Sequence, residues 1–203
     1  MLFIFFPQLY QFRDKITSIN VDYHLDLLDD YLFPKQGIFI EGSLEKAGNY
    51  LLETDRKYFK YKTSVDFYYT VRDVLTFHLN GFYCYSENAP EYRQFWVGGP
   101  NSFIGVDYNQ LLVEKMTYIK PEIDIEVFKN FRWSLIYNYG FNYDPFVLAI
   151  DYKLNESLSA WGSGFEYKTP VGPIKLTLAK SVQSISDELN NKFYFYLTAG
   201  YNF

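Results

Sequence analysis

The stretch at residues 192–203 constrains the fold of this chain more than any other segment. It reads KFYFYLTAGYNF and alternates in character with a period of two. Because successive side chains of a β-strand point to opposite sides, the pattern predicts a strand with one apolar and one polar face. The apolar face holds Phe193, Phe195, Leu197, Ala199, Tyr201 and Phe203, and the polar face holds Lys192, Tyr194, Tyr196, Thr198, Gly200 and Asn202. A solvated chain end is normally polar and frayed, so this strand indicates a surface that avoids water.

The same alternation recurs along most of the sequence. Residues 1–13 are either an edge strand, which Pro7 would suit, or an N-terminal arm. No helical segment and no linker interrupts the series, which predicts a single all-β domain over residues 1–203. The nine alternating segments are 19–26, 38–45, 59–72, 75–85, 114–127, 131–144, 161–168, 174–179 and 192–203.

Composition favours a membrane barrel over a soluble β-sandwich. Aromatic residues make up 22% of the chain, yet the mean hydropathy is −0.20. No run reaches the roughly 18 to 20 apolar residues of a membrane helix, whereas alternating barrel strands produce this mixture. The charged face of residues 114–127 fits either water or a filled lumen, and charges of both signs can pair across a narrow lumen. We therefore expect an antiparallel transmembrane β-barrel of 8–10 strands.

Several classes of function are disfavoured by the sequence. The net charge of −5 argues against nucleic acid as a partner, and the single cysteine, Cys84, excludes an internal disulfide. Neither His24 nor His78 has a recognisable ligand spacing, so no metal and no cofactor is expected. No GxSxG element is present, and we expect no enzyme activity. The opening MLFIFFPQLYQFR lacks a basic region and a cleavage site, so a signal peptide is not present in this chain.

Five elements follow one another in a characteristic order. They are LDDYLFPKQG, FWVGGPNSFIG, IYNYG, GFEYKTPVGPIKL and the closing Phe203. In this order they resemble the BamA-like outer-membrane assembly-factor superfamily, also called bacterial surface antigen domains, over roughly residues 20–203. The resemblance implies a bacterial outer-membrane location and a long loop that folds into the lumen. Family barrels have sixteen strands, and the present segments correspond to the last nine or so, without POTRA modules or a passenger domain.

The resemblance also implies candidate site residues. In the family, an arginine before the glycine of the loop tip meets an acidic residue on the inner wall, in a motif that ends in glycine. These positions hold Ile104 and Asn138 here, with Gly105 and Gly140 as the glycines. Losing both charges together is physically consistent, because a buried charge without its partner costs about 3–5 kcal/mol. The loop motif as a whole comprises Gly98, Gly99, Phe103, Ile104 and Gly105.

We expect the loop to tuck inward, held by Phe103 and by hydrogen bonds from Asn138; a flexible surface loop is the alternative. The predicted function is a membrane scaffold or a component of protein insertion or secretion. The alternatives are the membrane anchor of a longer surface-displayed enzyme and a soluble β-barrel that binds an apolar ligand. Expected partners are the lipid bilayer, a second copy through open strand edges, and the barrel assembly machinery, which would recognise a terminal signal of Phe195, Leu197, Tyr201 and Phe203.

Overall fold

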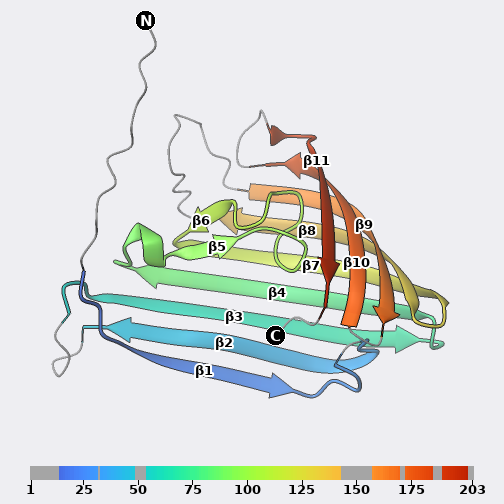
Figure 1. Ribbon diagram of the computed structural model, residues 1–203, viewed down its shortest axis with the longest axis horizontal. Helices are drawn as coiled ribbons and strands as arrows, with labels where there is room; N and C mark the ends of the chain where they lie inside the picture. Colours follow the sequence, from blue (N-terminus) through green and yellow to red (C-terminus); the bar gives the residue numbers. More distant parts are fainter. Residues whose placement is uncertain are drawn as a thin grey trace, which may run out of the picture.

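The computed structural model describes residues 14–31, 33–48, 54–142, 157–169, 172–184 and 189–200. It is a curved antiparallel sheet of nine strands in the order β1-β2-β3-β4-β7-β8-β9-β10-β11 (Figure 1). These strands are β1 (Ser18–Asp26), β2 (Gln36–Ala47), β3 (Tyr58–Val71), β4 (Leu75–Glu87), β7 (Lys115–Phe128), β8 (Phe131–Asn142), β9 (Ser157–Thr169), β10 (Gly172–Gln183) and β11 (Phe193–Ala199).

All nine predicted segments correspond to these strands, and the all-β antiparallel fold is confirmed. The sequence reasoning missed a second, two-stranded sheet inside the predicted long loop. It consists of β5 (Phe95–Val97) and β6 (Leu111–Val113), and one turn of 3-10 helix (Glu91–Arg93) precedes it. No helix in the described part of the chain is long and apolar enough to cross a membrane.

Tight turns set the register of the long strands. The connection from β3 to β4 consists of Arg72, Asp73 and Val74, and Arg72 and Asp73 have positive φ values of 54° and 57°. Positive φ values suit tight hairpin turns, and thirteen consecutive residue pairs form between β3 and β4. A β-bulge near Glu126 and Phe128 precedes the turn into β8.

The two faces of the sheet differ sharply in burial. On β7, Ile119 is 51% exposed on the outer face, while Lys120 and Glu122 are only 7% and 4% exposed on the inner face. The charged side of residues 114–127 is therefore the buried one, as a filled lumen requires. Glu122 Oε1 accepts a hydrogen bond from Lys175 Nζ of β10 at 3.0 Å, and His78 Nε2 lies 2.7 Å from Asp66 Oδ1.

The connection between β1 and β2 covers one end of the concave face. Phe33 is buried, and the Arg132 guanidinium of β8 lies 4.1 Å from its ring centroid and donates to its carbonyl oxygen at 3.1 Å. Asp29 Oδ1 accepts hydrogen bonds from the backbone N–H groups of Lys35 at 2.8 Å and Gln36 at 3.0 Å. Partial burial acts to raise the pKa of the Asp29 carboxyl. The backbone hydrogen bonds outweigh this effect and hold the pKa below its ordinary value.

The two outermost strands, β1 and β11, each pair with a single neighbour among the described residues. The sheet is therefore not closed there. The predicted tenth strand at residues 1–13 lies outside the described residues and stays a prediction.

Candidate functional site

The long loop between β4 and β7 lies against the concave face of the sheet, within the curve formed by β7 to β11 (Figure 1). Its tip is built by tight backbone turns: Gly99 N donates to Phe103 O and Ser102 N donates to Gly99 O, both at 3.1 Å. Gly98 and Gly105 have φ values of 133° and 83°, a region that side chains disfavour. A side chain at Gly105 would overlap the Ala160 side chain of β9, so this glycine lets the loop backbone touch the wall.

Phe103 and Ile104 at the tip are the two largest fully buried side chains in the described part of the chain. Ile104 is fully buried, and its Cδ1 lies 3.1 Å from the position that a Cβ would take at Gly162 of β9. Phe103 packs edge-on against Tyr118, with ring centroids 5.8 Å apart. Its Cε2 lies 3.0 Å from the Cβ position at Gly140. Two wall glycines thus provide room for two loop side chains.

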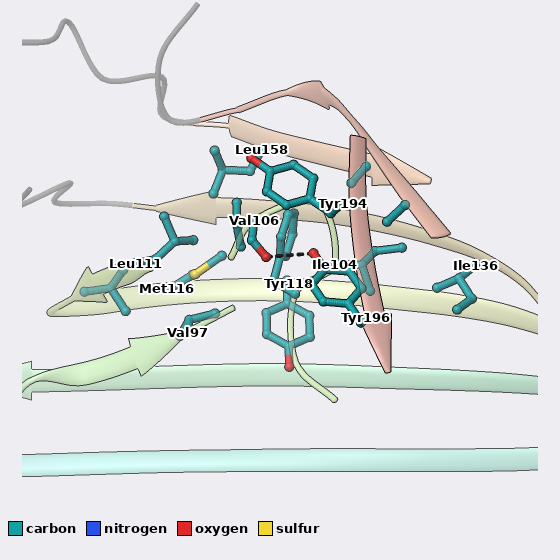
Figure 2. Packing of buried hydrophobic residues seen from close by; sticks show 14 of the residues in the cluster. Val97, Ile104, Val106, Leu111, Met116, Tyr118, Ile136, Leu158, Tyr194 and Tyr196 are labelled. Atoms are coloured by element: carbon teal, nitrogen blue, oxygen red, sulfur yellow. Dashed lines mark hydrogen bonds between the residues drawn. The ribbon is translucent and has the colours of Figure 1, made fainter. Parts of the chain in front are cut away.

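Figure 2 shows the cluster that surrounds this tip. It joins side chains of the loop, of the wall and of β11 into one buried apolar body. Its members are Cys84, Val97, Phe103, Ile104, Val106, Leu111, Val113, Met116, Tyr118, Ile136, Leu158, Ala160, Ala179, Tyr194 and Tyr196. We call the contact between the loop tip (residues 98–106) and strands β8 to β11 the loop seat.

Tyr196 of β11 fastens the tip from the other side. Its hydroxyl accepts a hydrogen bond from Gly105 N at 3.0 Å and donates one to Val106 O at 2.7 Å (Figure 2). Tyr108 packs edge-on against the same ring at 5.9 Å, and Tyr194 stacks on it at 6.3 Å. One side chain therefore satisfies two buried backbone groups of the loop.

Tyr194 and Tyr196 are the residues that sequence reasoning missed. It placed both on the polar face of the terminal strand, and they do face inward, but they are 4% and 3% exposed within the apolar cluster. The description of that face as polar was wrong because the loop, not water, lies opposite it. Two adjacent inward-facing tyrosines, where the other inward positions of the strand are small or polar, are the signal that could have revealed this.

Asn138 of β8 lies on the inner wall, fully buried. Its Nδ2 donates to Ser102 O at 3.5 Å, the upper limit for a hydrogen bond, and its Oδ1 has no partner among the described residues. The backbone of the loop, two residues before Ile104, is thus what meets Asn138. At the two positions where the resemblance implies an ion pair, this chain has an apolar side chain beside Gly162 and a neutral amide.

The other predicted site residues are distributed differently. Phe195 and Leu197 project from the outer face of β11 and are 64% and 63% exposed. Tyr201 and Phe203 lie outside the described residues, so the terminal assembly signal stays a prediction. His24 lies on β1 and His78 on β4, and no group of three or more metal-ligating side chains occurs in the described part of the chain.

Comparisons with known proteins match this architecture. The family model of the Omp85 superfamily domain matches residues 6–203. The crystal structure of BamA from Haemophilus ducreyi lacking POTRA domains 1–3 has a TM-score of 0.70 and 16% identity, over 88% of this chain and 41% of that chain. CdiB from Acinetobacter baumannii has a TM-score of 0.62 and 12% identity, over 89% of this chain and 32% of that chain. The comparison with curated proteins found no match.

The present chain spans less than half the length of either matched structure. At 16% and 12% identity, the similarity shows a shared fold and no more. The contacts of the loop seat are formed by residues of this chain, and substitutions can test them.

We predict that Tyr196→Phe destabilises the folded chain by about 1–3 kcal/mol, because Gly105 N and Val106 O lose their buried partner. Tyr194→Phe is the matched control: the Tyr194 hydroxyl is buried and has no hydrogen-bond partner among the described residues, so its removal is neutral or stabilising. Urea unfolding in detergent micelles measures both variants. Equal losses for the two would contradict the role assigned to the Tyr196 hydroxyl.

Ile104→Arg should lower the free energy of unfolding by about 3–5 kcal/mol, because it buries a charge without a partner. This loss is larger than the one expected for Tyr196→Phe. Adding Asn138→Asp provides a carboxylate on the neighbouring wall, and the double variant should regain at least half of that loss in the same unfolding measurement. A double variant no more stable than Ile104→Arg alone would show that an arginine at position 104 does not reach a carboxylate at position 138.

Proposed function

This chain belongs to the Omp85 superfamily, whose barrels are bacterial outer-membrane proteins, and from that premise we propose that it forms part of an outer-membrane barrel wall. Its proposed role is that of a membrane scaffold or component in protein insertion or secretion. Members of the superfamily are non-enzymatic assembly or transport barrels. The absence of enzyme activity in this chain stays a prediction.

The outer face of the sheet is the observation that carries the proposal. Along successive strands it presents large apolar side chains outward, whereas charged side chains in the middle of these strands, such as Lys120, Glu122 and Lys175, point inward. Lipid accepts such a surface, and each inner strand is hydrogen-bonded to a neighbouring strand on both sides. Outward-facing residues include Ile19, Val21, Val65, Phe67, Tyr69, Phe77, Leu79, Ile119, Ile123, Leu135, Tyr137, Trp161, Phe165, Leu178, Phe195 and Leu197.

The interior supports a closed resting state rather than an open pore. The loop seat fills one end of the concave face, and Phe33 beneath Arg132 covers the other. Between them, Lys175 and Glu122 connect β10 to β7. Passage of a polypeptide would therefore require the loop to leave its seat, which makes the seat the control point of the proposed function.

Two further partners remain proposals. The exposed outer side chains of β11 support recognition of the terminal strand by the barrel assembly machinery. Self-association through the open edges of β1 and β11 is the other, and sedimentation in detergent measures it.

Two tryptophans of equal exposure test the membrane assignment. Trp161 on the outer face of β9 is 51% exposed, and Trp96 on β5 of the loop is 50% exposed. We predict that brominated phosphatidylcholine quenches Trp161 strongly and Trp96 weakly after the chain is folded into vesicles. Trp96→Phe with Trp133→Phe isolates the first fluorophore, and Trp133→Phe with Trp161→Phe isolates the second.

The two side chains have nearly the same exposure. A difference in quenching would therefore reflect whether each side chain faces lipid or water. Quenching of Trp161 that is as weak as that of Trp96 would place the outer face away from lipid. A chain that stays folded and soluble without detergent, with no quenching at either position, would favour the soluble barrel for apolar ligands instead.

A further inference from the structure

The connection between β1 and β2 reaches across the concave face of the sheet. We call its residues 27–35 the strap. The strap joins two neighbouring strands, yet it contacts Arg132 of β8 and Lys168 of β9, which lie beyond β3, β4 and β7 in the sheet order. It lies at the end of the sheet where short turns join β3 to β4 and β7 to β8, and the long loop joins β4 to β7 at the opposite end (Figure 1).

The strap is buried at one point. Phe33 and Pro34 are buried, whereas Leu27 is 61% and Tyr31 is 55% exposed. The Arg132 guanidinium donates to the carbonyl oxygens of both buried residues, at 3.1 Å and 3.4 Å, and lies over the Phe33 ring. This anchor therefore combines a cation–π contact with two hydrogen bonds to the backbone of the strap.

Asp30 supports the anchor from within the strap. Its Oδ1 accepts a hydrogen bond from Phe33 N at 3.1 Å, and its Oδ2 lies 3.1 Å from Lys168 Nζ. The Asp30 side chain is 45% exposed, and an ion pair that water reaches contributes little to stability. Because a segment with few buried apolar contacts opens more easily than a whole domain unfolds, release of Phe33 should free the strap locally.

The strap and the loop tip line the same chamber. Its volume is about 280 Å³, and it is lined by Leu28, Tyr31 and Pro34 of the strap and by Pro100 and Asn101 of the loop tip. Charged side chains of the wall face it, among them Asp66, Lys120, Glu122 and Asp124. The chamber thus has two covers, formed by different segments and held by different strands.

We propose that the strap is a second gate of the lumen, which opens at the Phe33 anchor while the loop stays in its seat. Tyr196 of β11 holds one cover and Arg132 of β8 holds the other, so each can be released by itself. Passage along the lumen then needs two separate events, one at each end. This inference rests on the proposed function for its purpose, but the opening of the strap is measured without any client polypeptide.

Two thiols in one molecule report the two covers. The native Cys84 is fully buried and belongs to the apolar cluster around the loop tip. Ser134→Cys adds a thiol on β8, because Ser134 is 1% exposed and its hydroxyl donates at 2.5 Å to Asp124 Oδ1, a carboxylate of the chamber. The full chain in detergent micelles is treated with a water-soluble methanethiosulfonate reagent. Mass spectrometry of the separated peptides gives the rate at each thiol.

We expect Phe33→Ala to raise the labelling rate at position 134 at least about tenfold and to leave that of Cys84 unchanged, as local opening predicts. Leu27→Ala is the matched control: it removes another large apolar side chain of the strap, one that is exposed, and should change neither rate. Asp30→Ala should give a smaller rise at position 134. Because Asp30 is exposed, this variant keeps the test valid if Phe33→Ala does not fold.

Two results would overturn the proposal. The first is a labelling rate at position 134 that neither Phe33→Ala nor Asp30→Ala changes, because the strap would then not cover the chamber. The second is an equal rise at position 134 and at Cys84, because the strap would then not open separately from the loop. Quenching of Trp161 by brominated lipid in the same variants keeps the proposed function apart: strong quenching with unchanged labelling contradicts the gate alone.

Discussion

The position of the long loop depends on the Tyr196 hydroxyl, which bridges Gly105 N and Val106 O. Inside a barrel, buried backbone groups cannot turn to water, so the loop is held only if the wall provides partners. Tyr196 provides both on one side chain, and Ile104 and Phe103 fill the space left by Gly162 and Gly140. Loop, wall and terminal strand therefore form one buried body, and displacement of the loop would expose apolar and polar groups together.

The seat holds the loop without the ion pair that the resemblance implies at positions 104 and 138. An arginine at position 104 and an aspartate at position 138 would have to be desolvated and kept paired. Ile104 and Asn138 avoid that cost. The directional hydrogen bonds that fix the loop tip come instead from Tyr196 of β11. Because β11 is also an outermost strand of the sheet, the position of the loop and the state of this edge are mechanically connected.

Local patterns in the sequence predicted the strands, because alternation records which face of each strand avoids water. The β5–β6 sheet was missed, since strands of three residues are too short to show a period. Alternation also cannot tell what lies opposite an inward side chain, which is why Tyr194 and Tyr196 were assigned to a polar face. The contact of Arg132 with Phe33 joins residues 99 positions apart, and nothing local in either segment encodes it.

The loop tip belongs to the folded interior, and amide hydrogen exchange of the full chain in lipid nanodiscs tests this placement. The Gly105 amide, which donates to Tyr196, should exchange as slowly as the amides in the middle of β10, which is hydrogen-bonded to a strand on each side. A Gly105 amide that exchanges as fast as that of the exposed residue Tyr108 would show that the tip is not held in the interior.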